Sequence, residues 1–164
     1  MMVPQAVADK LNAQVKEEFF SYWTYLQMSY KLNEMGFNGF AKWFEKQAGE
    51  EMAHATKIAH YLVEVGAPVK LATLETPKAD YKSVKEIVET ALEHEKKITR
   101  LINECADVAE KANDRATANF LAWFIDEQIE EVATAQKLLD LVSAAGDQRI
   151  HLLMIEGRIF ELRG

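Results

Sequence analysis

Residue types that would indicate several other protein classes are scarce or missing in this sequence. It has one cysteine, Cys105, so no disulfide can form within the chain. No apolar run reaches the roughly 18 residues of a transmembrane helix, and no apolar signal segment follows Met1. Acidic residues outnumber basic ones by 26 to 19, which argues against a basic face for nucleic acid or an anionic membrane. We therefore expect a cytoplasmic protein with neither nucleic acid nor a membrane among its partners.

Helix breakers are also few, with seven glycines and three prolines in 164 residues. Hydrophobic residues make up 49% of the chain, enough for one domain with a substantial core. In four segments, residues of buried type recur at alternating steps of four and three, which is the seam of a packed helix. These segments are 5–33, 40–65, 84–109 and 117–142. The pattern predicts an all-α fold.

The connections between these segments predict the topology. Residues 37–39 form a short turn, which makes the first two helices antiparallel neighbours. Pro68 and Pro77 interrupt the helical pattern over 66–82, and this connection is long enough to run the length of a four-helix bundle. Ser83 to Glu86 has the spacing of a capping box that opens the third helix.

These patterns therefore predict a single domain with two parts. Residues 1–146 form a four-helix bundle with one long crossover between helices two and three. Residues 147–164 form a tail in which 148–162 is a short fifth helix. This segment is apolar on too many sides to lie free in water, so we expect it to be covered by a partner.

Each of the four seams carries polar residues at mid-length, where an ordinary helix would bury leucine. Glu51 and His54 are three residues apart, so both project from one helix face, a pairing used to build di-metal sites in helical bundles. The other seams contribute Glu18, Glu95, Gln128 and Glu131. Burying an uncompensated carboxylate costs on the order of several kcal/mol. Four buried acids at matching depth therefore predict bound cations that balance their charge. Two divalent ions would balance them, and this donor set suits Fe, Mn or Zn.

Around these positions the sequence resembles bacterial non-haem ferritin along nearly its whole length. The resemblance rests on Glu18 with Tyr25 one heptad later, on the pair His94 and Glu95, and on the runs EEMAHA (50–55) and NFLAWFIDEQIEE (119–131). It implies a ferritin-like bundle that acts as an iron-storage ferroxidase. Fe(II) would be oxidised by O2 or peroxide, and Fe(III) would be deposited as mineral inside a shell of twenty-four chains. The fifth helices would meet at the four-fold axes.

The resemblance also implies roles for individual residues. One iron would be held by Glu18, Glu51 and His54. A second iron would be held by Glu51, Glu95 and Glu131. Gln128 would lie close to the second iron, and Tyr25 within hydrogen-bonding range of the centre. A third iron position is matched by Glu50, Glu127 and Glu130. These three acids flank seam positions by one residue, about 100° around their helices, and a solvated face is the other interpretation.

Departures from related sites narrow the choice within the family. Bacterioferritins and rubrerythrins carry a second Glu-x-x-His pair on the fourth helix, whereas this chain has Glu131 in place of the histidine. The resulting site is asymmetric and rich in oxygen ligands, which fits storage better than peroxidase activity. Met52 matches the position of the bacterioferritin haem methionine, but non-haem ferritins have Met there too, so we interpret it as a packing residue and expect no haem.

Two other functions remain open from the sequence. One is a di-metal oxidase or peroxidase that stores nothing, and the other is a four-helix interaction protein whose seam acids only set the helix register. A DNA-protecting mini-ferritin is disfavoured, because no Lys/Arg-rich tail precedes Leu11. Of the remaining candidates, His60 and His94 are expected at the surface or behind the ligands, and Cys105 as a small core residue.

Overall fold

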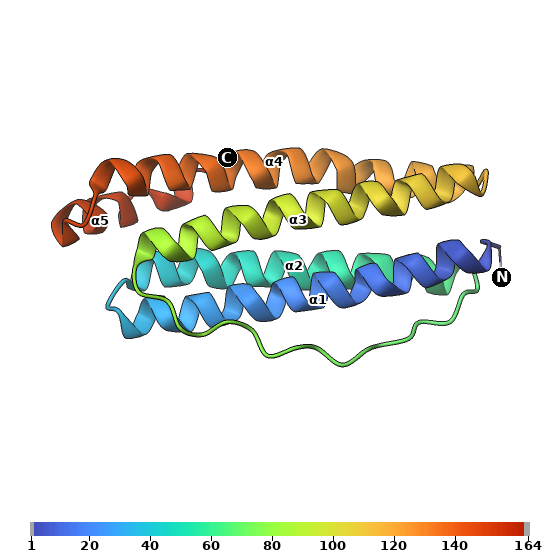
Figure 1. Ribbon diagram of the computed structural model, residues 1–164, viewed down its shortest axis with the longest axis horizontal. Coiled ribbons are helices and arrows are strands. Elements are labelled where there is room, and N and C mark those ends of the chain that lie inside the picture. Colours follow the sequence, from blue (N-terminus) through green and yellow to red (C-terminus); the bar gives the residue numbers. More distant parts are fainter. Residues whose placement is uncertain (1, 163–164) are drawn as a thin grey trace.

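The computed structural model describes residues 2–162, and within them the chain is helical with no strand. In this range four long helices lie side by side: α1 (Gln5–Glu34), α2 (Asn38–Glu64), α3 (Val84–Lys111) and α4 (Arg115–Ala145). The short helix α5 (Arg149–Glu156) and the 3-10 turn η1 (Ile159–Leu162) lie near the end of the bundle where α1 turns into α2 (Figure 1). Among the described helices, none is both long enough and apolar enough to cross a membrane. The predicted all-α bundle with a short fifth helix is confirmed.

Helices end close to where the sequence predicts, because each end has a residue suited to it. Gly36 and Gly66 have φ angles of 84° and 73°, a conformation that side chains disfavour, and they follow α1 and α2. The Ser83 hydroxyl accepts a hydrogen bond of 3.1 Å from the Glu86 N–H and so caps α3. The Glu86 carboxylate accepts from the N–H one residue before Ser83. The first turn is shorter than predicted, since α2 already begins at Asn38.

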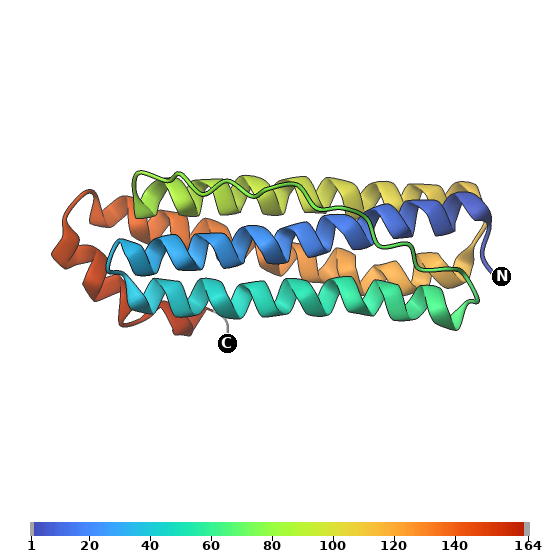
Figure 2. The same cartoon turned by 90° about the horizontal axis from the view of Figure 1, so that it is seen from below.

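The connection between α2 and α3 crosses the bundle along its length, as predicted (Figure 2). Two side chains of α1 hold it in place. The Asn12 amide donates to the Pro68 carbonyl over 3.0 Å and accepts from the Lys70 N–H over 2.7 Å. Further along, Lys16 forms a 2.7 Å ion pair with Glu75. A segment without helix or strand is thus fixed by side-chain contacts to α1 rather than by its own backbone.

The four predicted seams form the interior. All their residues are buried except Tyr22 and Tyr61, which are partly exposed. Within the described chain, the apolar part of this interior forms two clusters. One contains Tyr25, Phe40 and Phe44, and the other contains Leu11, Ile58 and Phe124. The buried acids of the seams belong to neither cluster and lie at mid-length of the helices.

Helix α5 is shorter than predicted, ending at Glu156 before Gly157 instead of continuing to residue 162. Two charged side chains attach it to the turn between α1 and α2. Arg149 donates to the carbonyls of Met35 and Gly36 over 3.1 and 3.4 Å, and Glu156 accepts from the Phe40 N–H over 3.1 Å. A cation thus faces the C-terminal end of α1 and an anion the N-terminal end of α2, which suits both helix dipoles.

Candidate metal centre

The predicted ligands converge at the middle of the bundle, and each of the four long helices contributes at least one of them. Glu18 comes from α1, Glu51 and His54 from α2, Glu95 from α3, and Glu131 from α4. The exposed fraction of each is 5% or less, and Glu51 and Glu95 are at 0%. The sequence pattern therefore identified the residues that face the interior, and the fold places them at one depth.

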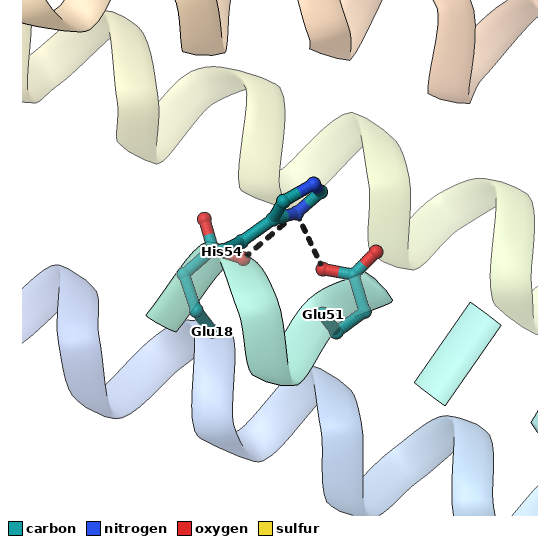
Figure 3. Close-up of side chains that lie close together, drawn as sticks. All are labelled: Glu18, Glu51 and His54. Atoms are coloured by element: carbon teal, nitrogen blue, oxygen red, sulfur yellow. Dashed lines mark hydrogen bonds and ion pairs between the residues drawn. The ribbon is translucent and has the colours of Figure 1, made fainter. Parts of the chain in front are cut away.

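Donor atoms of these residues form groups that could hold a metal ion. Within the described chain three groups have ligand atoms within 4.8 Å of one another: Glu18–Glu51–His54, Glu51–Glu95–Glu131 and His54–Glu127–Glu131. The first two are the ligand sets that the resemblance implies, and they share Glu51. Figure 3 shows the first: His54 Nδ1 is 3.3 Å from Glu51 Oε2 and 4.0 Å from Glu18 Oε2. Each group could hold a metal ion, and Glu51 belongs to both of these groups.

Two glutamines to which the sequence pattern gave no role donate hydrogen bonds to the buried acids. Gln14 Nε2 donates to Glu18 over 3.1 Å from one turn earlier in α1. Gln47 Nε2 donates to Glu131 over 3.1 Å from α2 to α4. Gln47 lies on the predicted seam of α2, and Gln14 lies four residues before Glu18 on the same helix face. Both residues could therefore have been predicted from the sequence to contact the buried acids.

Glu95 is held by Gln128, which was predicted close to the second iron, and by Tyr25, which was predicted within hydrogen-bonding range of the centre. The Tyr25 hydroxyl donates to Glu95 Oε1 over 2.6 Å, and Gln128 Nε2 donates to Glu95 Oε2 over 3.1 Å. Gln128 also lies 3.2 Å from the Thr99 hydroxyl. Burial, followed by the charges of Glu95 and its neighbours, raises the Tyr25 pKa well above its ordinary value. Tyr25 therefore keeps its proton and acts as a donor to the carboxylate.

Burial and mutual repulsion raise the pKa values of the buried acids in the metal-free protein. Burial raises the pKa of Glu18 to about 7, although a hydrogen bond from Gln14 opposes the shift. Burial also raises the pKa of Glu51 well above its ordinary value, and the charges of Glu95, Glu18 and Glu131 add to it. Like charges sharing one site are relieved by protonation, so the metal-free centre holds protons at neutral pH.

We expect metal binding to release these protons. The folded chain keeps the Glu18 proton between pH 4.5 and about 7, where the unfolded chain has lost it, so this group's stabilisation falls as pH rises through that window. A metal ion must displace the proton, and Zn(II) affinity should fall about tenfold per pH unit below 7 for each proton displaced. Calorimetric titrations at pH 6 and pH 8, in buffers of different ionisation enthalpy, count the protons. Equal proton counts at both pH values would contradict the assignment of Glu18.

His54 is confined by aromatic rings of α4. The ring centroids of Trp123 and Phe124 lie 5.6 and 6.0 Å from that of His54, both nearly perpendicular to it. Lys57 Nζ lies 3.3 Å from the centroid of the Trp123 ring, a cation–π contact at the surface of the bundle. None of these contacts follows from helical periodicity, because they depend on how α2 and α4 are rotated about their axes.

The three acids implied as a third iron position do not lie in equivalent surroundings. Glu127 is partly buried, and its Oε1 is 3.8 Å from His54 Nε2. Glu50 is partly buried and Glu130 is exposed. In the described chain, neither Glu50 nor Glu130 belongs to a group of three potential ligands. The third position therefore stays a prediction.

The other residues considered in the sequence are two histidines, Cys105 and Met52, and they differ in burial. His60 is exposed, whereas His94 is partly buried beside the Tyr25 ring, with its Nε2 2.6 Å from the Ser21 hydroxyl. Burial lowers the His94 pKa to about 4, so this ring is neutral at physiological pH. Cys105 is buried as expected, and burial raises its pKa to about 12. Met52, interpreted from sequence as a packing residue, is 45% exposed on the isolated chain.

Comparisons with known proteins agree with the fold. The sequence model of the family described as ferritin-like domain matches residues 8–145. A bacterial non-heme ferritin-like protein of Haemophilus influenzae is 39% identical over 155 residues, covering 94% of each chain. A bacterial non-heme ferritin of Bacteroides fragilis is 35% identical over 152 residues, covering 93% of this chain and 96% of its own. The open-pore ferritin of Archaeoglobus fulgidus superposes with a TM-score of 0.94 at 32% identity, with 96% of both chains covered.

Proposed function

Because this chain belongs to the ferritin family, we propose that it stores iron by oxidising Fe(II) at the buried centre and retaining Fe(III) as mineral in an oligomeric shell. One observation carries the proposal: two groups of buried ligands, Glu18–Glu51–His54 and Glu51–Glu95–Glu131, share the central residue Glu51. Ions held by the two groups would share the ligand Glu51, which would allow them to be oxidised as a pair. The cytoplasm is the location we expect for this activity.

The residues around the centre have distinct parts in the reaction. Two Fe(II) ions lose two electrons in total, which reduce O2 to hydrogen peroxide or hydrogen peroxide to water as protons are taken up. The four buried carboxylates supply the negative charge that favours Fe(III) over Fe(II). The protons that Glu18 and Glu51 hold without metal leave when iron binds. Tyr25 and Gln128 keep Glu95 oriented toward the second ion through their hydrogen bonds.

Sedimentation combined with iron analysis tests storage directly. The purified protein, loaded with Fe(II) in air, should sediment as a large assembly of about the twenty-four chains that the resemblance implies, with many more than two irons per chain. Stopped-flow absorbance should show rapid oxidation of about two Fe(II) per chain. An iron content that stops at two per chain would favour a di-metal oxidase or peroxidase. Absence of stoichiometric metal binding would favour an interaction protein whose acids set helix register.

The tail 147–164 is proposed to drive assembly of the shell. Leu152 and Ile159 are buried against the bundle, whereas Ile150, Met154 and Phe160 are 62, 66 and 49% exposed. An apolar face of this kind is costly in water and suits contact with copies of the same chain. The shell is therefore a homo-oligomer whose assembly depends on the outer face of α5.

We expect deletion of residues 148–164 to abolish the large assembly or to cause aggregation. A double variant, Ile150→Glu with Met154→Glu, should have the same effect on sedimentation while keeping the helical circular dichroism of the chain. As a matched control, Ile129→Glu places a charge at another exposed position, on α4. An unchanged large assembly in the double variant would show that this face of the tail does not drive association.

A further inference from the structure

We propose that Gln14 is a positioning residue for Glu18, which holds one carboxylate oxygen so that the other faces the first ion position, and that the Cys105 thiol fixes the orientation of the Gln14 amide. The inference rests on the proposed function and deepens it. It gives a role to two residues that lie outside the three groups of potential ligands found among residues 2–162.

The two oxygens of Glu18 have different surroundings. Oε1 accepts a hydrogen bond of 3.1 Å from Gln14 Nε2. Oε2 is buried without a hydrogen-bond donor in the described chain, and it lies 4.0 Å from Nδ1 of His54, a member of the same group of potential ligands. A carboxylate that is held at one oxygen has less freedom to rotate about its last side-chain bond. Gln14 therefore leaves Oε2 as the oxygen that faces the ion position.

The Gln14 amide acts on this position only through Glu18. The end that faces Glu18 is the NH2 group, which offers protons and no lone pair to a cation. The oxygen of the amide faces α3, where it lies 3.9 Å from Cys105 Sγ. Neither end of the amide is therefore directed at the ion position, which separates the role of a positioning residue from that of a ligand.

Cys105 determines which end of the amide faces Glu18. A thiol is a weak donor that suits the amide oxygen, so the NH2 group is left for the carboxylate. Burial raises the Cys105 pKa to about 12, and the thiol therefore keeps the proton that it donates. Gln14 and Cys105 are each 2% exposed, so water has little access to either end of the amide. Turning the amide over would lose both hydrogen bonds inside the core, which is costly.

Zn(II) binding to the assembled protein tests the proposal. Gln14→Leu removes the amide, and Ser29→Ala is the matched control, because it removes a buried hydrogen bond to the Ala41 carbonyl about three turns further along α1. Titration calorimetry gives the affinities, and anomalous diffraction from crystals soaked in limiting Zn(II) gives the occupancy of each position. We expect Gln14→Leu to weaken binding at the His54 position by about 10- to 100-fold, with the Glu95 position changed far less. Ser29→Ala should match the wild type at both positions.

The single cysteine provides a second measurement, which involves no metal. The S–H stretching band in the Raman spectrum of the metal-free protein comes from Cys105 alone, and its frequency falls when the thiol donates a hydrogen bond. We expect the band to move to higher frequency in Gln14→Leu and to stay in place in Ser29→Ala, a pattern that a loss of stability alone would not produce. Cys105→Val should weaken Zn(II) binding at the His54 position by a smaller factor than Gln14→Leu, and Cys105→Ser, which keeps a donor, should bind like the wild type.

Wild-type affinity at the His54 position in Gln14→Leu, or an equal loss at both positions, overturns the inference, and so does an S–H band that this variant leaves unchanged. The Zn(II)-loaded wild-type crystal gives a reading that needs no variant. One oxygen of Glu18 should contact the ion while the other keeps its hydrogen bond to Gln14, and a Glu18 carboxylate turned away from Gln14 overturns the proposal. Absence of Zn(II) from both positions in that crystal would contradict the proposed function itself, whereas failure of the inference alone leaves both ions in place.

Discussion

Replacing Glu51 by Gln is expected to raise the melting temperature of the metal-free protein and to remove nearly all of its stabilisation by Zn(II). Burial raises the pKa of the fully buried Glu51 and the charges of three other acids add to the shift, so the wild-type centre is strained when no metal is present. Gln keeps the shape of the side chain, and its amide group can keep the 3.3 Å hydrogen bond with His54 Nδ1. We expect a gain of about 1 kcal/mol, corresponding to roughly 2–4 °C for a chain of this size.

The loss of metal binding should be the larger part of the effect, because Glu51 belongs to both predicted ion positions. Thermal melts with and without Zn(II), beside stopped-flow oxidation of Fe(II), measure both parts. Glu50→Gln is the matched control, since it removes the same charge one residue earlier from a partly buried position. A Glu51→Gln protein that melts well below wild type, or that still gains full stability from Zn(II), would contradict the two-ion centre.

Replacing Glu95 by Gln should separate the second ion from the first. Both oxygens of Glu95 accept hydrogen bonds, from Tyr25 and Gln128, and Gln can accept at only one of them. A rotation of the Gln128 amide presents its oxygen to the new amide, so metal-free stability should equal or exceed that of wild type by about 1 kcal/mol. Fe(II) oxidation should slow by at least about 100-fold, because both electrons must leave a centre that has lost an anionic ligand.

Zn(II) should still stabilise the Glu95→Gln protein, by roughly half of the wild-type gain, because Glu18, Glu51 and His54 remain. Melts with and without Zn(II) and single-turnover oxidation test each statement. Tyr25→Phe provides a comparison, since it removes one donor to Glu95 and keeps the charge. Normal oxidation in a Glu95→Gln protein that melts well below wild type would show Glu95 to be structural, and the second ion position would lose its α3 ligand.

Helical periodicity predicted most of this fold because burial along a helix depends on position within its own sequence. The seam of α3, from Val84 to Ala109, is buried at every predicted position. Glu95 could therefore be assigned to the interior without knowledge of its neighbours. The crossover was predictable for a related reason, since Pro68 and Pro77 prevent helix in a stretch as long as the bundle.

Contacts between helices were harder to predict from the sequence, because they depend on the rotation of one helix relative to another. The neighbours of His54 on α4 illustrate this limit, since Trp123 and Glu127 are off the seam. A seam pattern marks Gln128 and gives no indication that Glu127 faces the imidazole. The end of α5 was also misjudged, because an apolar run does not show where Gly157 allows the chain to leave the helix.

The separation of the apolar interior into two clusters has a consequence for how the bundle unfolds. Each cluster stabilises one half of the helices, and a layer of mutually repelling acids lies between them when no metal is bound. Local opening can then begin in either half and stop at this layer, so the halves behave as separate cooperative units in hydrogen exchange. Under the proposed function, ions bound to ligands from all four helices would join the two halves. We therefore expect metal binding to make the two halves exchange as one cooperative unit.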